Sequence, residues 1–392
     1  MKIGIDIRTL MDAQYSGVSE YTFNLIKEIL RLDNHNEYRL FYNSFGDCSN
    51  IPKFTEKNVK LVKYNYPNKV LNYLFFKIFN YPKIDKELEV DVFFMPHINF
   101  IGKSSTGKSL VTIHDLSFLK YPEFFSWRKN FWHKMINVKK LIKRFDRVVA
   151  VSENTKKDII DLCGINENKI EVIYPGLGGE FINAEINKDK LEDVKIKYNL
   201  PDKYILYLGT IEPRKNVDGI IKAYNELRSA YSPSRSRRAE ADEMQDYKLV
   251  IAGGKGWKSS NIYKEWEKSE FKNDINFLGY IDGEDKVCLY NLASVFIYPS
   301  FYEGFGFPPL EAMASGVPVI TSYAASLPEV AGSAALMVNP YNINDMARAL
   351  KEILTDENLK NKLIKQGLEQ AKKFSWENTA KEYLKIFNHE PR

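Results

Sequence analysis

Short apolar runs alternate along the chain with stretches whose apolar residues recur at helical spacing. The runs are typical of buried strands, and the periodic stretches are typical of amphipathic helices. In the first half, strands are predicted at Lys2–Ile7, Tyr38–Tyr42, Val90–Met95, Leu110–Ile113 and Arg147–Val151. In the second half, they are predicted at Tyr204–Leu208, Lys248–Ala252, Ile275–Leu278, Val295–Pro299 and Val317–Thr321. Helices are predicted between the strands, for example over Ser19–Leu32 and Val217–Leu227. This alternation predicts parallel sheets in an α/β fold.

The two sets of strands are separated by a polar segment, Asn183–Lys203, and we place a hinge near Gly176–Asp202. A chain of 392 residues is longer than one hydrophobic core usually supports. We therefore expect an N-terminal domain over 1–180, a C-terminal domain over 181–375, and a helix within 376–392 that returns to the N-terminal domain. The charge-dense segment Ser229–Asp246 is interpreted as a flexible surface insertion, and a ligand patch formed by its arginines is the alternative.

The formal net charge of +5 arises in residues 1–180, which hold 27 basic and 21 acidic residues. Because this excess is mild, it does not indicate a nucleic-acid partner, but it is compatible with acidic ligands or an anionic membrane. The three cysteines are far apart and lack metal-site spacing, which favours a reducing compartment. The chain starts in a strand pattern and has no apolar run long enough to span a membrane. We expect a cytoplasmic protein.

One run of residues matches a phosphate-binding motif by its letters alone. Gly102–Ser109 fits the Walker A pattern, GxxxxGK[ST]. That motif requires a helix directly after the loop, because the amides at the helix start cradle the phosphate. Here a predicted strand, Leu110–Ile113, follows instead. We interpret the run as a turn between elements.

The segment with the most chemical information follows the strand that ends at Pro299. A loop with two glycines leads into a helix expected to start near Pro308 or Pro309, with Glu303 in the loop and Glu311 in the first helical turn. A helix amino end at the carboxyl edge of a parallel sheet is suited to a diphosphate. A loop carboxylate can accept hydrogen bonds from the paired hydroxyls of a sugar. Stabilisation of the helix by its own acidic residue would explain Glu311 but not Glu303.

This segment, with its EX7E spacing, resembles the family 4 retaining glycosyltransferases of the GT-B fold. The resemblance covers nearly the whole chain, because further motifs occur in the family's order. These are Gly4-Ile-Asp6, Ser16-Gly17-Val18, Ile113-His114-Asp115-Leu116, Leu208-Gly209-Thr-Ile-Glu-Pro-Arg214-Lys215-Asn216, Phe277-Leu-Gly279-Tyr280 and Ser326-Leu-Pro-Glu329-Val. The resemblance implies two Rossmann-like domains that face each other across a cleft. The second would hold most of the donor and the first most of the acceptor.

The resemblance also implies roles in binding the donor sugar and its nucleotide. Glu303 would hold hydroxyls of the donor sugar, and Phe305 and Gly306 would offer it backbone amides. Glu311 would bind the ribose hydroxyls.

Arg214 and Lys215 would neutralise the negative charge that develops on the diphosphate as it leaves. Gly209 precedes them in the same donor-binding motif. Positive groups aimed at that charge stabilise the transition state without a metal, and no DxD motif is present to hold one. Many relatives carry an arginine where this chain has Thr210, so Arg214 must do more here or that contact is lost.

Four further residues complete the expected site. Gly279 and Tyr280 would lie near the nucleobase, and Gly17 would leave room beside phosphate and acceptor. His114 would contact the donor sugar from the N-terminal domain. It ends a predicted strand, where ligands of α/β proteins bind, and this favours a role in binding over a place in the core.

The stretch Phe124–Val148 carries eight basic residues and one acidic residue. Phe131, Met135, Val138, Ile142 and Phe145 are predicted to form one apolar stripe of a helix. One interpretation is a helix that packs this stripe on the sheet. The other is a basic face that meets anionic lipid or a lipid-linked acceptor.

Together these features predict a retaining hexosyltransferase, without a covalent enzyme intermediate, that works in surface polysaccharide synthesis. The partners are a nucleotide-sugar donor and a glycan or lipid-linked acceptor, and the enzyme lies in the cytoplasm or at the inner face of the membrane. The resemblance is greatest to the mannosyltransferase branch, so GDP-mannose is the first donor expected and no cofactor is implied. A nucleotide-sugar epimerase on the same fold and a non-catalytic nucleotide-sugar-binding partner are the alternatives.

Overall fold

The computed structural model describes residues 1–11, 17–46, 48, 50–68, 70–105, 107–182, 187–231 and 244–388. The chain divides into two compact units. Unit 1 consists of Met1–Lys120, Trp127–Gly176 and Phe374–Arg392, and unit 2 consists of Tyr121–Ser126 and Leu177–Lys373. The middle of the predicted insertion, 232–243, and part of the predicted hinge, 183–186, lie outside the described residues.

Within the described residues, unit 1 is built on a parallel sheet in the order β3-β2-β1-β4-β5-β6-β7. The strands are β1 (Lys2–Asp6), β2 (Glu37–Asn43), β3 (Val59–Tyr64), β4 (Val92–Met95), β5 (Lys108–Ile113), β6 (Arg147–Ala150) and β7 (Ile170–Val172). The helices are η1 (Arg8–Met11), α1 (Gly17–Leu32), η2 (Val70–Phe79), α2 (Ile84–Glu87), α3 (Ser117–Lys120), α4 (Trp127–Ile136), α5 (Val138–Lys143), α6 (Glu153–Cys163), η4 (Glu167–Lys169) and α17 (Trp376–Asn388).

Unit 2 repeats the plan with a parallel sheet in the order β10-β9-β8-β11-β12-β13. Its strands are β8 (Tyr204–Leu208), β9 (Lys248–Ala252), β10 (Ile275–Gly279), β11 (Val295–Tyr298), β12 (Val319–Ser322) and β13 (Ala335–Val338). Its helices are η3 (Pro122–Phe124), α7 (Gly179–Ile182), α8 (Lys188–Lys197), η5 (Pro213–Lys215), α9 (Val217–Ala230), α11 (Ser260–Lys268), η6 (Lys272–Asp274), η7 (Gly283–Asp285), α12 (Lys286–Asn291), α13 (Phe307–Ala314), α14 (Leu327–Ala331), α15 (Ile343–Thr355) and α16 (Glu357–Ala371).

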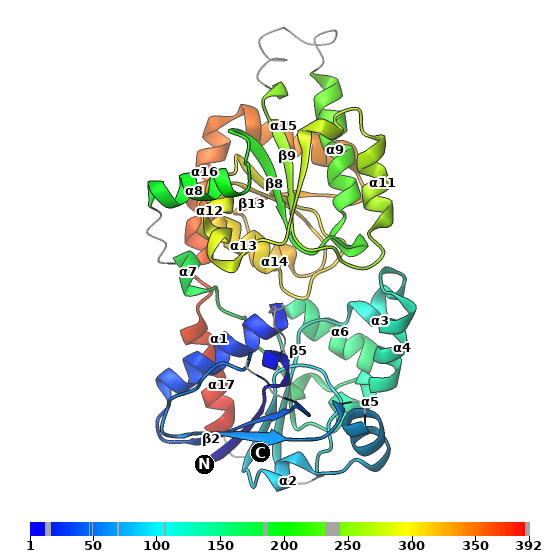
Figure 1. The fold of residues 1–392 in the computed structure, drawn as a ribbon, viewed down its shortest axis with the longest axis vertical. Coiled ribbons are helices and arrows are strands. Elements are labelled where there is room, and N and C mark those ends of the chain that lie inside the picture. Colours follow the sequence, from blue (N-terminus) through cyan, green and yellow to red (C-terminus); the bar gives the residue numbers. More distant parts are fainter. Residues whose placement is uncertain are drawn as a thin grey trace. The chain divides into compact units, whose positions relative to one another are not determined.

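Both sheets are doubly wound, with helices on either face (Figure 1). In each sheet the strand order reverses beside the first strand, between β1 and β4 in unit 1 and between β8 and β11 in unit 2. The loops that leave the carboxyl ends of two such strands turn away from each other, and ligands of this fold class bind where they part. The topology therefore selects the loops after β8 and β11 as the place to look for a site in unit 2.

The predicted strands are present, and β3, β7 and β13 are additional. β3 lies at a sheet edge with half of its side chains exposed, and Lys60 and Lys63 interrupt its apolar pattern. β7 is only three residues long. β3 and β7 therefore lack a continuous apolar run, whereas β13 is apolar at all of its four positions and was missed because it is short.

The basic stretch does not form one helix as predicted. Asn137 adopts a left-handed conformation, with φ of 54°, and ends α4 while its side chain accepts a hydrogen bond from the Lys140 amide at the start of α5. The predicted stripe is consequently split, because Val138, Ile142 and Phe145 are buried whereas Phe131 is exposed. Because of the break, apolar side chains of α5 point into the core, whereas Phe131 of α4 points to solvent.

The last described helix, α17, packs against α1 in unit 1 (Figure 1). The Tyr383 hydroxyl lies 2.6 Å from the Tyr21 hydroxyl and 2.7 Å from Thr112 Oγ1 on β5, and all three side chains are buried. These contacts attach the C-terminal helix to the first sheet.

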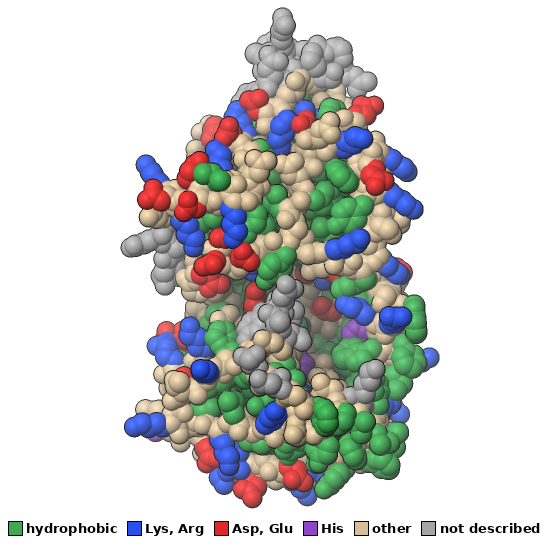
Figure 2. Space-filling model, viewed as in Figure 1, with side chains coloured by type: hydrophobic (Ala, Val, Ile, Leu, Met, Phe, Trp, Pro, Cys, Tyr) green, Lys and Arg blue, Asp and Glu red, His purple; other side chains and the backbone are tan. Residues whose placement is uncertain are grey.

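Apolar side chains gather on one surface of unit 1 (Figure 2). On η2 and α4 the exposed ones are Val70, Leu74, Ile78, Phe79, Trp127 and Phe131. The two elements are joined where Lys77 Nζ donates to the Met135 carbonyl, 2.8 Å away. We call this the apolar surface of unit 1. Among the described residues, no helix has the length and apolar character needed to cross a membrane.

Candidate active site

Two loops at the carboxyl edge of the unit 2 sheet bring together the charged residues of the candidate site. η5, which contains Arg214 and Lys215, follows β8, and the loop with Glu303 follows β11. Because β8 and β11 are neighbours, residues 88 positions apart in sequence come into contact. The strand order alone thus explains why these three residues meet.

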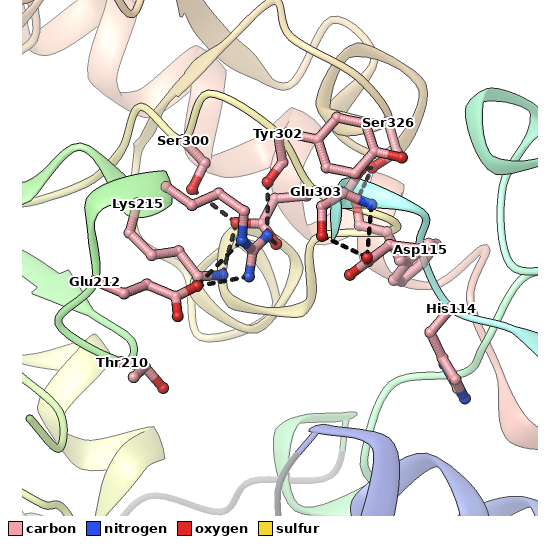
Figure 3. A network of polar contacts seen from close by, with 12 residues as sticks. His114, Asp115, Thr210, Glu212, Lys215, Ser300, Tyr302, Glu303 and Ser326 are labelled. Atoms are coloured by element: carbon pink, nitrogen blue, oxygen red, sulfur yellow. Dashed lines mark hydrogen bonds and ion pairs between the residues drawn. The ribbon is translucent and has the colours of Figure 1, made fainter. Parts of the chain in front are cut away.

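Glu303 is the centre of this cluster (Figure 3). Its carboxylate accepts hydrogen bonds from Lys215 Nζ at 2.6 Å, Arg214 Nη1 at 2.8 Å and Ser300 Oγ at 2.7 Å. The side chain is 9% exposed. Three donors on one carboxylate fix its orientation. A carboxylate that recognises sugar hydroxyls needs such a fixed orientation.

The ionisation states of Glu303 and Lys215 depend on each other. Burial would raise the pKa of Glu303, but the positive charges of Arg214 and Lys215 hold it at about 2. Burial also lowers the pKa of Lys215, and the negative charge of Glu303 opposes this. Lys215 Nζ additionally donates to the Tyr298 hydroxyl. Glu303 is therefore ionised at neutral pH although it is buried.

Glu212 is a fourth charged member that the sequence did not indicate. One of its oxygens accepts from Arg214 at 2.8 Å and 3.1 Å, while Arg214 also donates to the Tyr302 carbonyl at 2.6 Å. The other oxygen, Oε2, is buried without a hydrogen-bond partner among the described residues. Two carboxylates thus balance the two cations. Thr210, where the resemblance led us to expect a further positive charge, is exposed.

The start of α13 differs from the prediction in two respects. The helix begins at Phe307, so Glu311 lies beyond its first turn, where its carboxylate accepts from the Tyr290 hydroxyl at 2.9 Å. Pro308 and Pro309 occupy the next two positions and have no N–H group. The helix start therefore offers fewer free amides than an ordinary one, and an anion there depends more on the amides of the preceding loop.

Gly306 is required by its surroundings. Its φ is 115°, and a Cβ atom at this position would lie 2.7 Å from Leu327 Cδ2. The neighbouring Phe305 is buried, and its carbonyl accepts from Ser326 Oγ at 2.7 Å. The same hydroxyl lies 2.9 Å from the Glu303 carbonyl oxygen. Ser326 therefore shapes the loop from its far side.

The remaining donor-side residues named from the sequence lie at the same sheet edge. Gly209 follows β8, and Gly279 ends β10 with φ of 74°. Tyr280 is 54% exposed, which leaves its ring available for stacking.

In unit 1, His114 directly follows β5, as predicted. Its Nε2 lies 2.8 Å from the Pro96 carbonyl oxygen, and its ring meets that of Tyr21 edge-on. Burial lowers the pKa of His114, which favours the neutral imidazole. Gly17 begins α1 and is exposed, whereas Ser16 of the same motif lies outside the described residues.

Sequence reasoning assigned no role to Glu212, Tyr298, Ser300 or Ser326, although all four contact the predicted residues. Their positions beside the motif residues were the only available signal, since hydroxyls and a carboxylate in loops carry no periodic pattern. Within the part of the chain that the structure describes, no cluster of three or more His, Cys, Asp or Glu residues could hold a metal ion.

Comparison with known proteins gives the family. Residues 189–370 match the model of "Glycosyl transferases group 1", and residues 15–178 match that of "Glycosyltransferase Family 4". The "O-antigen chain mannosyltransferase B" of Escherichia coli is 32% identical over 301 residues, which cover 75% of this chain and 72% of that protein. The chain belongs to the group 1, family 4 glycosyltransferases.

Two further comparisons show how much of this glycosyltransferase resembles other proteins in sequence and in structure. The "Serotype-specific mannosyltransferase WbdA" of Escherichia coli is 33% identical over 277 residues, and this covers 70% of the chain but only 32% of WbdA. The chain thus matches about a third of the length of that relative. The sucrose-phosphate synthase structure from Thermosynechococcus elongatus superposes with a TM-score of 0.72 at 19% identity, covering 98% of each chain. This likeness confirms the predicted GT-B fold.

Proposed function

We propose that this glycosyltransferase moves a mannosyl group from a nucleotide-diphosphate sugar to a glycan or lipid-linked acceptor in surface polysaccharide synthesis. Several of the relatives that it matches are named as mannosyltransferases, two of them of the O-antigen chain. GDP-mannose is the first donor that we propose. The observation that carries the proposal is the Glu303 carboxylate, held ionised by Arg214 and Lys215 at the carboxyl edge of the unit 2 sheet.

In this proposal, donor binding redistributes the charges of the cluster. Arg214 and Lys215 are already paired with Glu212 and Glu303, so the cluster has no excess positive charge for a diphosphate. When sugar hydroxyls donate to Glu303, its hold on the two cations weakens. Arg214 and Lys215 then turn toward the diphosphate and stabilise its charge as the bond to the sugar breaks. Glu311, whose buried carboxylate accepts from the Tyr290 hydroxyl, would take the ribose.

We propose that the reaction retains the anomeric configuration without a covalent intermediate. The Glu303 oxygens accept from three side chains in the structure and would accept from the sugar hydroxyls once the donor binds, which makes this carboxylate a poor nucleophile in both states. His114 in unit 1 would contact the sugar with its neutral ring.

We further propose that the enzyme works at the inner face of the membrane, where a lipid-linked acceptor would be present. The apolar surface of unit 1 supports this, because its exposed Phe79 and Trp127 are large apolar side chains on η2 and α4, and the basic α5 follows α4 in the chain. Such a combination is typical of surfaces that enter the interface of an anionic bilayer.

The test is Glu303→Ala in the full chain, assayed for mannosyl transfer from GDP-mannose. We expect turnover to fall at least ~100-fold, the scale of losing one transition-state contact, while the circular dichroism spectrum stays that of wild type. Glu369→Ala is the matched control, because Glu369 is an exposed residue of α16 whose carboxylate pairs with the exposed Lys372. Near-full turnover of Glu303→Ala would show that the site is misplaced.

The same assay separates the alternatives. A transferase releases the free nucleoside diphosphate in proportion to the glycosylated acceptor, whereas an epimerase yields a second nucleotide sugar without any acceptor. Donor binding without turnover on any acceptor would favour a non-catalytic partner. Donor affinity should be the same with chelator as with magnesium, since the proposed site neutralises the diphosphate with side chains.

A further inference from the structure

A second concave site lies in unit 1, where the loops that lead into β5, β6 and β7 meet α2. It is a cavity of about 490 Å³, within the size range of small-molecule sites. Six cationic side chains line it, and we call it the basic pocket. They are Lys83, Lys86, Lys103, Lys143, Arg144 and Lys169.

The basic pocket is separated from the carboxyl edge of its sheet, where His114 lies. Lys103, Arg144 and Lys169 precede β5, β6 and β7, so they lie at the amino edge. His114 follows β5 at the opposite edge. The six residues of β5 at roughly 3.3 Å each put these edges about 20 Å apart. The pocket is therefore distinct from the part of unit 1 expected to meet donor and acceptor.

Lys103 is the innermost cation. It is 3% exposed, and its Nζ donates to the Ser104 carbonyl at 2.9 Å. Arg144 is fixed by neutral groups, since its two Nη atoms donate to the Asn80 side chain at 2.7 Å and to the carbonyls of Ile101 and Lys103 at 3.3 Å. Both positive charges are thus held in place without a carboxylate.

The pocket has a large excess of positive charge. Over the ranges that the structure describes, none of its six cations forms an ion pair. One carboxylate, Asp146, lines the pocket with the six cations and accepts from the Ser109 hydroxyl at 2.5 Å, and Asp85 accepts from the hydroxyl of the lining residue Ser104. Burial lowers the pKa of Lys103 and of Lys169, and the negative charge of Asp146 opposes this in both without cancelling it. Gathered like charges of this kind are unfavourable unless an anion joins them.

We propose that the basic pocket binds a phosphomonoester group. Arg144 presents a fixed guanidinium fork and the lysines supply mobile donors, the combination that suits a doubly charged phosphate. The phosphate can belong to a lipid headgroup or to a soluble molecule. A second cavity shares Arg144 with the pocket and is lined by Lys77 and Met135, which join η2 to α4. The proposal uses no residue of the donor site and does not depend on the transfer reaction.

The Walker-like run takes part in this pocket in an unexpected way. Lys103 and Ser104 belong to it, but they line the pocket at the amino edge of the sheet, and Lys108 begins β5 instead of a helix. The run thus contributes a buried lysine to a phosphate site that is not a P-loop.

The first experiment measures the thermal stability of the full chain with inorganic phosphate against chloride of equal ionic strength. We expect phosphate to raise the melting temperature of wild type. In Lys143→Gln/Lys169→Gln, which changes two side chains at the pocket, the dissociation constant of phosphate should rise about 30-fold, the factor for two cations near an anion. Lys139→Gln/Lys157→Gln removes two exposed lysines outside the pocket and should respond like wild type. Lys215→Met should keep the response, which excludes the donor site as its origin.

A further variant guards against a simple loss of folding. Lys103→Met removes the buried charge, so it should melt at a higher temperature than wild type without phosphate and lose the phosphate response.

A lipid headgroup and a soluble molecule are distinguished with vesicles of phosphatidylcholine that contain either phosphatidic acid or an equal charge of phosphatidylglycerol. A preference for phosphatidic acid that the pocket variants lose identifies a lipid headgroup, and a response to inorganic phosphate alone identifies a soluble one. Equal responses in pocket and control variants, or no response of wild type to either probe, would overturn the proposal.

Discussion

At the scale of single residues, the ionisation of Glu303 depends on neighbours distant in sequence. Its carboxylate is buried, yet its pKa lies at about 2 because Arg214 and Lys215 contact it. Such a group binds hydroxyls as an acceptor over the whole physiological range of pH. Glu212 assists indirectly, since it holds the Arg214 guanidinium in the orientation that reaches Glu303.

A pH prediction follows from this pKa. Since the pKa of Glu303 in the folded protein is below its ordinary value of 4.5, the ionised carboxylate stabilises the fold above that value, and this stabilisation is lost as the pH falls toward about 2. We compare the free energy of unfolding of wild type with that of Glu303→Gln by denaturant titration. The difference should be constant from neutral pH to about pH 5 and should shrink below it. A difference that stays unchanged down to about pH 3 would contradict the assigned ion pairs.

At the scale of elements, the attachment of α17 to α1 and β5 depends on a chain of buried hydroxyls. Tyr383→Phe leaves the hydroxyls of Tyr21 and Thr112 without their shared partner. We expect the free energy of unfolding to fall by about 1–3 kcal/mol, the cost of leaving buried polar groups unsatisfied. Tyr341→Phe, at a largely exposed tyrosine, is the control and should change stability little. Equal stability of the two variants would show that the hydroxyl chain contributes nothing.

A second prediction at this scale concerns Lys108, the first residue of β5. Lys108 Nζ donates to the Phe387 carbonyl at 3.0 Å, so its role is to join β5 to the end of α17. Lys108→Ala should lower the free energy of unfolding by no more than about 1 kcal/mol, the usual worth of one such hydrogen bond. Sugar transfer should remain at the wild-type level. ATP hydrolysis by wild type that disappears in this variant would revive the P-loop interpretation.

At the scale of the whole molecule, the net positive charge of the chain and the apolar surface defined above both belong to unit 1. Changing Lys139, Lys140 and Lys143 to Gln should weaken co-sedimentation with anionic vesicles, since each basic residue near such a surface contributes about 1 kcal/mol. Wild-type binding should fall as salt rises, because the attraction is screened. Nucleotide affinity should not change, as Arg214 and Lys215 belong to unit 2. If wild type never sediments with anionic lipid, the proposed membrane surface is wrong.

Much of the fold could be predicted from local pattern. The central strands of both sheets are buried on both faces, so their apolar runs are continuous and easily recognised. Edge strands such as β3 carry lysines and half-exposed positions, which removes the pattern. The break at Asn137 was missed because the basic stretch has helical spacing throughout, while the left-handed residue that ends α4 depends on packing that spacing does not record.

What the sequence by itself determined is the two α/β units, the loop with Glu303 before a helix, and the family. These depend on neighbours in the chain, through periodicity, proline and glycine positions and short motifs. Only the tertiary structure decided which charges meet. The order of the strands brings Glu212, Arg214 and Lys215 to Glu303, and the loops before β5, β6 and β7 gather the six cations of the basic pocket. Electrostatic energy depends on distance in space, and that distance is set only when the sheets form.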